Sequence, residues 1–146
     1  MSSIAVQIKK DMIQAMKDGD NLKKTVLRTF SSEFKNAEID KGSMLEDVDV
    51  IKVLSKLEKQ RKDSIQAYKE AGREDLVVSE QEELAIIQQY LPSKLSNDEL
   101  SKLVDQAIIE LGDGANFGSV MKFVVVKAEG RADGNQIKEL VQSKLA

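Results

Sequence analysis

The 146-residue sequence contains no cysteine, no histidine and no tryptophan, and it has a single proline. Without cysteine, the chain has no disulfide, no thiolate zinc site and no cysteine nucleophile. Without histidine, it lacks the side chain that most often accepts a proton near neutral pH and that most often binds transition metals. Catalysis by this chain alone would have to depend on Asp, Glu, Lys, Tyr or Ser.

The glycine-containing segments do not supply a nucleotide site. Gly112-Asp-Gly114-x-x-x-Gly118 follows a predicted helix rather than a strand, and it has neither the Gly-x-Gly-x-x-Gly spacing nor a Lys-Ser or Lys-Thr pair. No Gly-x-Ser-x-Gly element is present. We therefore expect no catalytic residue, no metal ligand and no cofactor, and we expect this segment to be a turn between helices.

Aromatic residues are scarce, at 4%, whereas charged residues make up 32% and hydrophobic residues 41% of the chain. β-Sandwiches and barrels need β-branched and aromatic residues and many turns, whereas long solvated helices need few of either. The composition therefore predicts an all-α fold. The length allows one good core or two small ones.

Long apolar runs are absent too: no segment approaches the roughly 18 to 20 apolar residues of a membrane span. The early Asp11, Asp18 and Asp20 are unlike the acid-poor composition of a mitochondrial transit peptide. We therefore expect a cytoplasmic protein with no membrane association. With 22 basic and 25 acidic residues, the net charge of −3 also excludes a global basic field, so any binding to nucleic acid must be local.

Apolar spacing and stop residues predict seven helices, over about residues 3–18, 21–41, 46–71, 79–90, 96–111, 117–129 and 133–145. Ser79-x-x-Glu82 and Ser96-x-x-Glu99 have the spacing of capping boxes and so predict two of the starts. Phe123-Val-Val-Val-Lys-Ala alone is also compatible with a strand, but the flanking Asn-x-Gly and Gly-Arg-Ala-Asp-Gly favour a helix over 118–129.

The single proline, Pro92, marks the predicted domain boundary, because the residue before a proline is pushed out of the helical region. We expect a helical N-terminal lobe of about four helices over residues 1–92. A C-terminal three-helix bundle is expected over residues 96–146.

One arginine interrupts an apolar stripe on the long third helix. Leu54, Leu57, Ile65 and Tyr68 follow helical spacing, and Arg61 occupies the position between them where an apolar residue is expected. A buried charge without a partner costs on the order of several kcal/mol. The arginine avoids this cost only if it is paired or reaches water. Arg61 is therefore expected either to bridge a carboxylate or to line a groove between helices.

Two further arginines stand at predicted helix junctions. Arg73 follows Gly72, and Arg131 lies between Gly130, which suits a left-handed helix end, and Asp133, which suits the cap of the next helix. Each junction is compatible with a purely structural turn. An exposed arginine beside free backbone N–H groups is equally compatible with a phosphate contact.

Five motifs in order closely resemble those of the bacterial YqeY-like proteins, over a match from about residue 5 to the end. They are Lys-Gln-Arg-Lys-Asp-Ser (59–64), Ala-Gly-Arg-Glu-Asp-Leu (71–76), Glu83 with Tyr90-Leu-Pro, Gly118-x-x-Met121 and Gly130-Arg-Ala-Asp-Gly. This family is related to the tail region of the B subunit of the glutamine-dependent aminoacyl-tRNA amidotransferase. The resemblance implies a helical N-terminal lobe followed by a three-helix lobe.

In that amidotransferase the tail region binds tRNA, while the chemistry occurs in other parts of the enzyme. The resemblance therefore implies an accessory module that binds tRNA or a tRNA-dependent enzyme, with Lys127, Arg131 and Lys138 as candidate phosphate contacts. Two alternatives remain open. The chain could be a component of a carbon–nitrogen ligase with glutamine as amide donor, active only with partners, or a protein-interaction adaptor that uses a groove at Arg61, Tyr68 and Arg73.

Overall fold

The computed structural model describes residues 2–146 and confirms the all-α prediction: that part of the chain contains seven α-helices, one short 3₁₀ turn and no strand. The elements in chain order are α1 (Ser3–Asp18), α2 (Asn21–Lys41), α3 (Asp47–Glu70), α4 (Glu74–Tyr90), α5 (Asn97–Leu111), η1 (Gly112–Gly114), α6 (Phe117–Ala128) and α7 (Gly134–Leu145).

The chain divides into two compact units between Leu91 and Pro92. We refer to the part up to Leu91 as the N-terminal unit and to Pro92–Ala146 as the C-terminal unit. Each has a hydrophobic core of its own. Among the described residues, none of the helices combines the length and the apolar character that crossing a bilayer requires.

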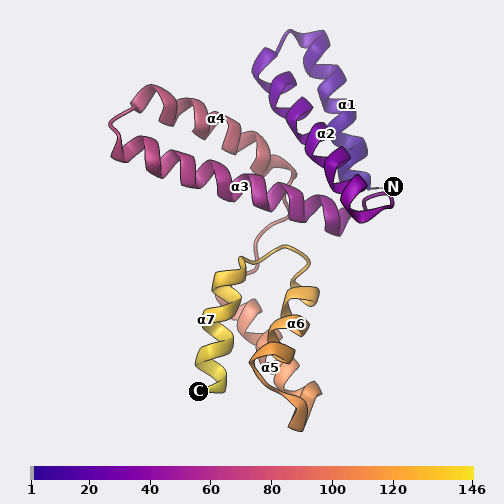
Figure 1. The fold of residues 1–146 in the computed structure, drawn as a ribbon, viewed down its shortest axis with the longest axis vertical. Helices are drawn as coiled ribbons and strands as arrows, with labels where there is room; N and C mark the ends of the chain where they lie inside the picture. Colours follow the sequence, from indigo (N-terminus) through magenta and orange to yellow (C-terminus); the bar gives the residue numbers. More distant parts are fainter. Residues whose placement is uncertain (1) are drawn as a thin grey trace. The chain divides into compact units, whose positions relative to one another are not determined.

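The N-terminal unit consists of two antiparallel helical hairpins, α1–α2 and α3–α4 (Figure 1). Its core is built around side chains with almost no exposed surface, including Leu27 and Phe30 of α2, Leu54 of α3 and Ile87 of α4. The ring of Phe30 packs against Phe34 and, edge to face, against Tyr90, so aromatic contacts join α2 to the end of α4.

The helix boundaries follow largely from local chemistry. The Asp20 side chain accepts a hydrogen bond from the Lys23 N–H at the start of α2, and Gly42 ends that helix with a positive φ of 78°. The start of α1 is held by a distant residue. The Asp47 carboxylate accepts hydrogen bonds from the Ser2 and Ser3 hydroxyls and from the Ile4 N–H.

The predicted start of the fourth helix at Ser79 is wrong, because α4 begins five residues earlier, at Glu74. Gly72 takes a φ of 71°, and the Leu76 and Val77 N–H groups hydrogen-bond to the Arg73 carbonyl. Glu74 and Asp75 lie in the first turn, where carboxylates complement the helix dipole. Val77 is buried, and the helix therefore includes residues 74–78, which the capping spacing at Ser79 had placed before its start.

The C-terminal unit is a bundle of α5, α6 and α7 (Figure 1). The predicted capping box at Ser96 and Glu99 is confirmed by reciprocal side-chain to backbone hydrogen bonds. Residues 117–128 are helical, as predicted, despite three consecutive valines. The Asn116 side chain caps the helix by accepting a hydrogen bond from the Ser119 N–H. Val120, Val124 and Ala128 follow at four-residue spacing and form a buried stripe in the bundle core.

Candidate functional site

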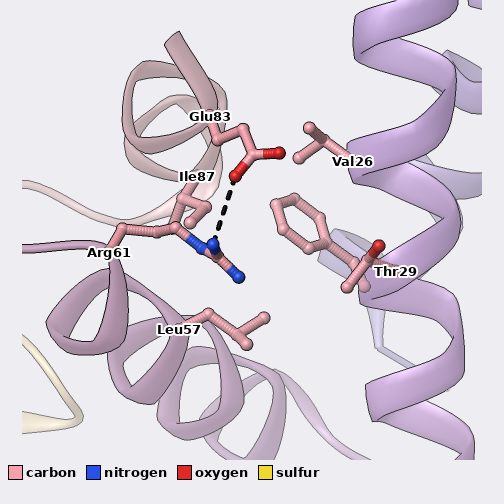
Figure 2. A pocket seen from close by; sticks show the side chains of 7 residues that line it. Val26, Thr29, Leu57, Arg61, Glu83 and Ile87 are labelled. Carbon is pink, nitrogen blue, oxygen red and sulfur yellow. Dashed lines mark ion pairs between the residues drawn. The ribbon is translucent and has the colours of Figure 1, made fainter. Parts of the chain in front are cut away.

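A small pocket in the N-terminal unit lies where α2, α3 and α4 meet. Its walls are mostly apolar, and one arginine and one glutamate lie among them (Figure 2). The lining residues are Val26, Thr29 and Phe30 of α2, Leu57 and Arg61 of α3, and Glu83 and Ile87 of α4. Arg61 therefore does line a recess between helices.

Arg61 also bridges carboxylates, so both expectations for this residue hold at once. An Nη atom of its guanidinium lies 2.8 Å from Glu80 Oε2 and 3.2 Å from Glu83 Oε2. The arginine side chain retains 29% of its exposed surface, and those of Glu80 and Glu83 retain 15% and 27%. The charge in the apolar stripe is thus satisfied by two carboxylates one turn apart on α4.

The charges at this pocket influence each other's proton affinity. The Glu80 hydrogen bond holds the pKa of the Arg61 guanidinium above its usual value. Burial raises the pKa of the Glu83 carboxyl, and the neighbouring Glu80 charge adds to that effect, while Arg61 opposes it. Glu80 is therefore the main partner of Arg61. Glu83 is a carboxylate whose charge is only partly compensated.

The structure does not join Tyr68 and Arg73 to this pocket, since neither lines it. Tyr68 is half-buried farther along α3. Arg73 is exposed at the α3–α4 turn and donates two hydrogen bonds of 3.3 Å to Asp75, two residues away. The Arg61 groove is thus smaller than the predicted one.

Arg131 has a structural role at the junction between α6 and α7. Its Nε donates a 2.8 Å hydrogen bond to the Ser93 carbonyl, and its own carbonyl accepts one from the Leu95 N–H, also at 2.8 Å. These hydrogen bonds connect the segment before α5 to the turn between α6 and α7. The guanidinium is half-exposed, with part of its donor capacity already in use.

Lys127 and Lys138, the other two candidate phosphate contacts, are exposed on either side of that turn. Lys127 lies in the last turn of α6, with its ammonium 5.8 Å from the centre of the Phe123 ring. Lys138 follows the start of α7 by four residues, about 6 Å along the helix axis. Neither forms an ion pair within the described residues. Two carboxylates, Glu129 and Asp133, share the turn and are also exposed.

Sequence reasoning did not identify Glu80 as the main partner of Arg61. The pattern that could have shown it is the three-residue spacing of Glu80 and Glu83, which places both on one face of a helix. It also did not predict the hydrogen bond of 2.7 Å from the Tyr90 hydroxyl to Asp11, which joins α4 to α1. That contact spans 79 residues and has no local pattern.

Residues 5–145 match the family described as Yqey-like protein. The chain belongs to the YqeY-like family. The YqeY-like relatives of known sequence include the "Altered inheritance of mitochondria protein 41, mitochondrial" of Vanderwaltozyma polyspora, 38% identical over 98% of this chain and 82% of that protein. The protein of the same name from Saccharomyces cerevisiae is 36% identical over 82% of this chain and 64% of that protein. The Lachancea thermotolerans protein is 42% identical over 62% and 49%.

The prediction of a cytoplasmic protein is contradicted by these YqeY-like relatives, whose names place them in mitochondria. The physical reason is that the early acidic residues belong to folded helices: Asp11 and Asp18 lie within α1, and Asp20 caps α2. The same folded domain can exist in either compartment, so its composition does not encode its location.

Proposed function

We propose that the protein is an accessory, non-catalytic helical module that binds tRNA or a tRNA-dependent enzyme. The observation that carries the proposal is the α6–α7 junction, where Lys127 and Lys138 are exposed without a carboxylate partner in the described chain. Phosphate oxygens are natural partners for such cations. The resemblance of the family to the tail region of the tRNA amidotransferase supports the choice of RNA. Glu129 and Asp133 weaken the local field, so the binding is expected to be strongest at low salt.

The proposal is tested by titrating the purified full chain with labelled total tRNA. The titration is repeated at several salt concentrations between roughly 50 and 200 mM, the range over which phosphate contacts are lost. Each neutralised phosphate contributes about −0.7 to −0.9 to the slope of log K against log salt. The variant Lys127→Gln/Lys138→Gln should weaken binding and reduce the slope by about 1 to 2.

The matched control is Lys56→Gln/Lys69→Gln, which removes the same charge from two exposed lysines of α3. It should bind tRNA within about twofold of the original chain, since neither residue is a proposed phosphate contact. No binding at low salt, or equal loss in both variants, would contradict the proposal.

We propose a second candidate, a protein-interaction adaptor, because the Arg61 pocket offers an apolar lining with an incompletely compensated carboxylate. A partner that presents an apolar side chain next to a cation would fit it. Arg61→Ala should then remove a stable partner from a pull-down, while Arg73→Ala, which alters an exposed arginine outside the pocket, should not. Circular dichroism of both variants checks that they remain folded. Equal retention of the partner by both variants argues against the adaptor.

A further inference from the structure

The exposed face of α2 carries a row of cations that neither the core nor the α6–α7 junction uses. Lys24, Arg28 and Lys35 are separated by four and seven residues. At 3.6 residues per turn, Arg28 and Lys35 lie about 40° and 20° around the helix from Lys24, so the three side chains follow one line about 16 Å long. Arg28 and Lys35 are exposed and Lys24 is half-buried.

These cations have no partner within the protein. Among the residues that the structure describes, Arg61 and Arg73 pair with carboxylates and Arg131 donates to Ser93, which leaves Arg28 as the one arginine with no hydrogen bond or ion pair. The side chains of Lys24 and Lys35 form none either. The five N–H donors of the Arg28 guanidinium and the ammonium groups of the two lysines are therefore not used within the described chain.

Acidic residues are almost absent from this part of α2. Over residues 21–37 the helix carries four cations and a single carboxylate, Glu33. Glu33 is half-buried and lies about 160° around the helix from the middle of the row. Glu38 follows one turn after Lys35, but it lines a pocket with Lys9 and Ala5 of α1.

The positions beside the row are polar and small. The exposed neighbours are Thr25, Ser32 and Asn36, and Ser31 is half-buried. Contacts to nucleic-acid phosphates and sugars use this mixture of Arg and Lys with Ser, Thr and Asn. Binding to a membrane surface requires a face of apolar side chains that inserts beneath the cations. The apolar face of α2, including Leu27 and Phe30, is buried in the core, and the exposed Leu22 and Ile39 lie before and after the row rather than along it.

We propose that the face of α2 formed by Lys24, Arg28 and Lys35 docks the sugar–phosphate backbone of RNA. This surface belongs to the N-terminal unit and shares no residue with the Lys127–Lys138 junction of the C-terminal unit. This proposal rests on the proposed RNA binding and adds a second surface to it. The two surfaces consist of different residues, so their variants test them separately. The hydroxyls of Thr25 and Ser32 and the amide of Asn36 supply further donors to phosphate oxygens and ribose.

The test compares three variants of the full chain in the titration with total tRNA. Lys24→Gln/Arg28→Gln/Lys35→Gln should weaken binding at least tenfold at low salt and reduce the salt slope by about 2 to 3. The matched control Lys56→Gln/Lys59→Gln/Lys69→Gln changes the same number of charges on exposed positions of α3 in the same unit, and it should change binding less than about threefold. Lys24→Arg/Lys35→Arg should retain binding. Thermal melts by circular dichroism confirm that each variant is folded.

The outcomes separate this surface from the one proposed above. Loss of binding in both the α2 variant and Lys127→Gln/Lys138→Gln supports both surfaces. Loss in the α2 variant with retention in Lys127→Gln/Lys138→Gln supports the α2 surface and rejects the junction. The reverse result overturns the α2 surface and leaves the junction. Equal effects of the α2 variant and the α3 control overturn it as well. Binding to vesicles of phosphatidylserine and phosphatidylcholine, without binding to tRNA, rejects both RNA surfaces.

Discussion

At the scale of single residues, Arg61 shows how one charge in an apolar stripe is accommodated. Its guanidinium forms two ion pairs with α4 and lies against Leu57 and Ile87 in the same pocket. The hydrogen bonds satisfy the charge, and the aliphatic part of the side chain still packs on the core. Arg61 therefore contributes to the contact between α3 and α4 even if no ligand enters the pocket.

Replacement of Arg61 by methionine keeps an unbranched apolar stem but removes the guanidinium, which leaves Glu80 and Glu83 next to each other without their cation. We expect the free energy of unfolding at pH 7 to fall by about 1 to 2 kcal/mol, at the lower end for a broken buried pair because all three side chains are partly exposed. Urea denaturation measures this loss. Arg73→Met, which removes an exposed pair, should cost much less stability than Arg61→Met.

The same variant should show a characteristic pH dependence. The folded-state pKa of Glu83 already lies above its ordinary value of 4.5, and removal of Arg61 should raise it further. A group with a raised folded-state pKa adds stability when protonated, and that stability is lost as the pH rises through the folded-state pKa. The deficit of Arg61→Met should therefore shrink as the pH falls from 7 toward 4.5. A deficit that is constant over this range would contradict the role of Glu83.

At the scale of secondary-structure elements, the end of α6 contains the one non-glycine residue with a positive φ among those described. Glu129 takes φ 50° and ψ 41°, and Gly130 follows with a φ of 78°. Side chains with a Cβ atom pay about 1 to 2 kcal/mol for this left-handed conformation. The helix ends here because Ala128 is the last residue of the buried stripe and Arg131 must turn to reach Ser93.

Glu129→Gly should relieve that strain. Part of the gain is offset by the greater freedom of glycine in the unfolded chain, so the expected net increase in the free energy of unfolding is about 0.5 to 1 kcal/mol. Glu129→Ala removes the same charge but keeps the Cβ atom, and it should leave stability nearly unchanged. Thermal unfolding followed by circular dichroism compares the two. Equal stabilisation by both variants would show that charge, rather than backbone strain, is responsible.

At the scale of the whole molecule, the two units have separate cores. Leu54 is completely buried among residues of α1 to α4, and Ile137 is buried among residues of α5 to α7. Neither core includes a residue of the other. The stability of each unit should therefore respond mainly to substitutions in its own core.

Leu54→Ala and Ile137→Ala test this independence. Each should cost about 2 to 4 kcal/mol, because a fully buried aliphatic side chain is removed and a cavity remains. In differential scanning calorimetry, each substitution should lower the melting temperature of one transition and leave the other in place. A single transition that shifts equally in both variants would show that the units unfold as one cooperative body.

The helical class, most helix ends and the interruption of the apolar stripe at Arg61 can be predicted from the sequence alone. These features depend on local chemistry, such as apolar spacing, left-handed glycines at Gly19 and Gly42, and the capping pairs of Ser96 and Asn116. The motifs also predicted the family to which the chain belongs.

The packing of the helices determines which charges already have partners. The structure showed that Arg61 is held by Glu80, that Arg131 fastens Ser93, and that Arg28 has no partner. It also showed that α4 starts at Glu74, because burial of Val77 outweighs the capping spacing at Ser79. The physical reason is the same in each case. Contacts between residues that are distant in sequence depend on how helices pack, and no local pattern specifies that packing.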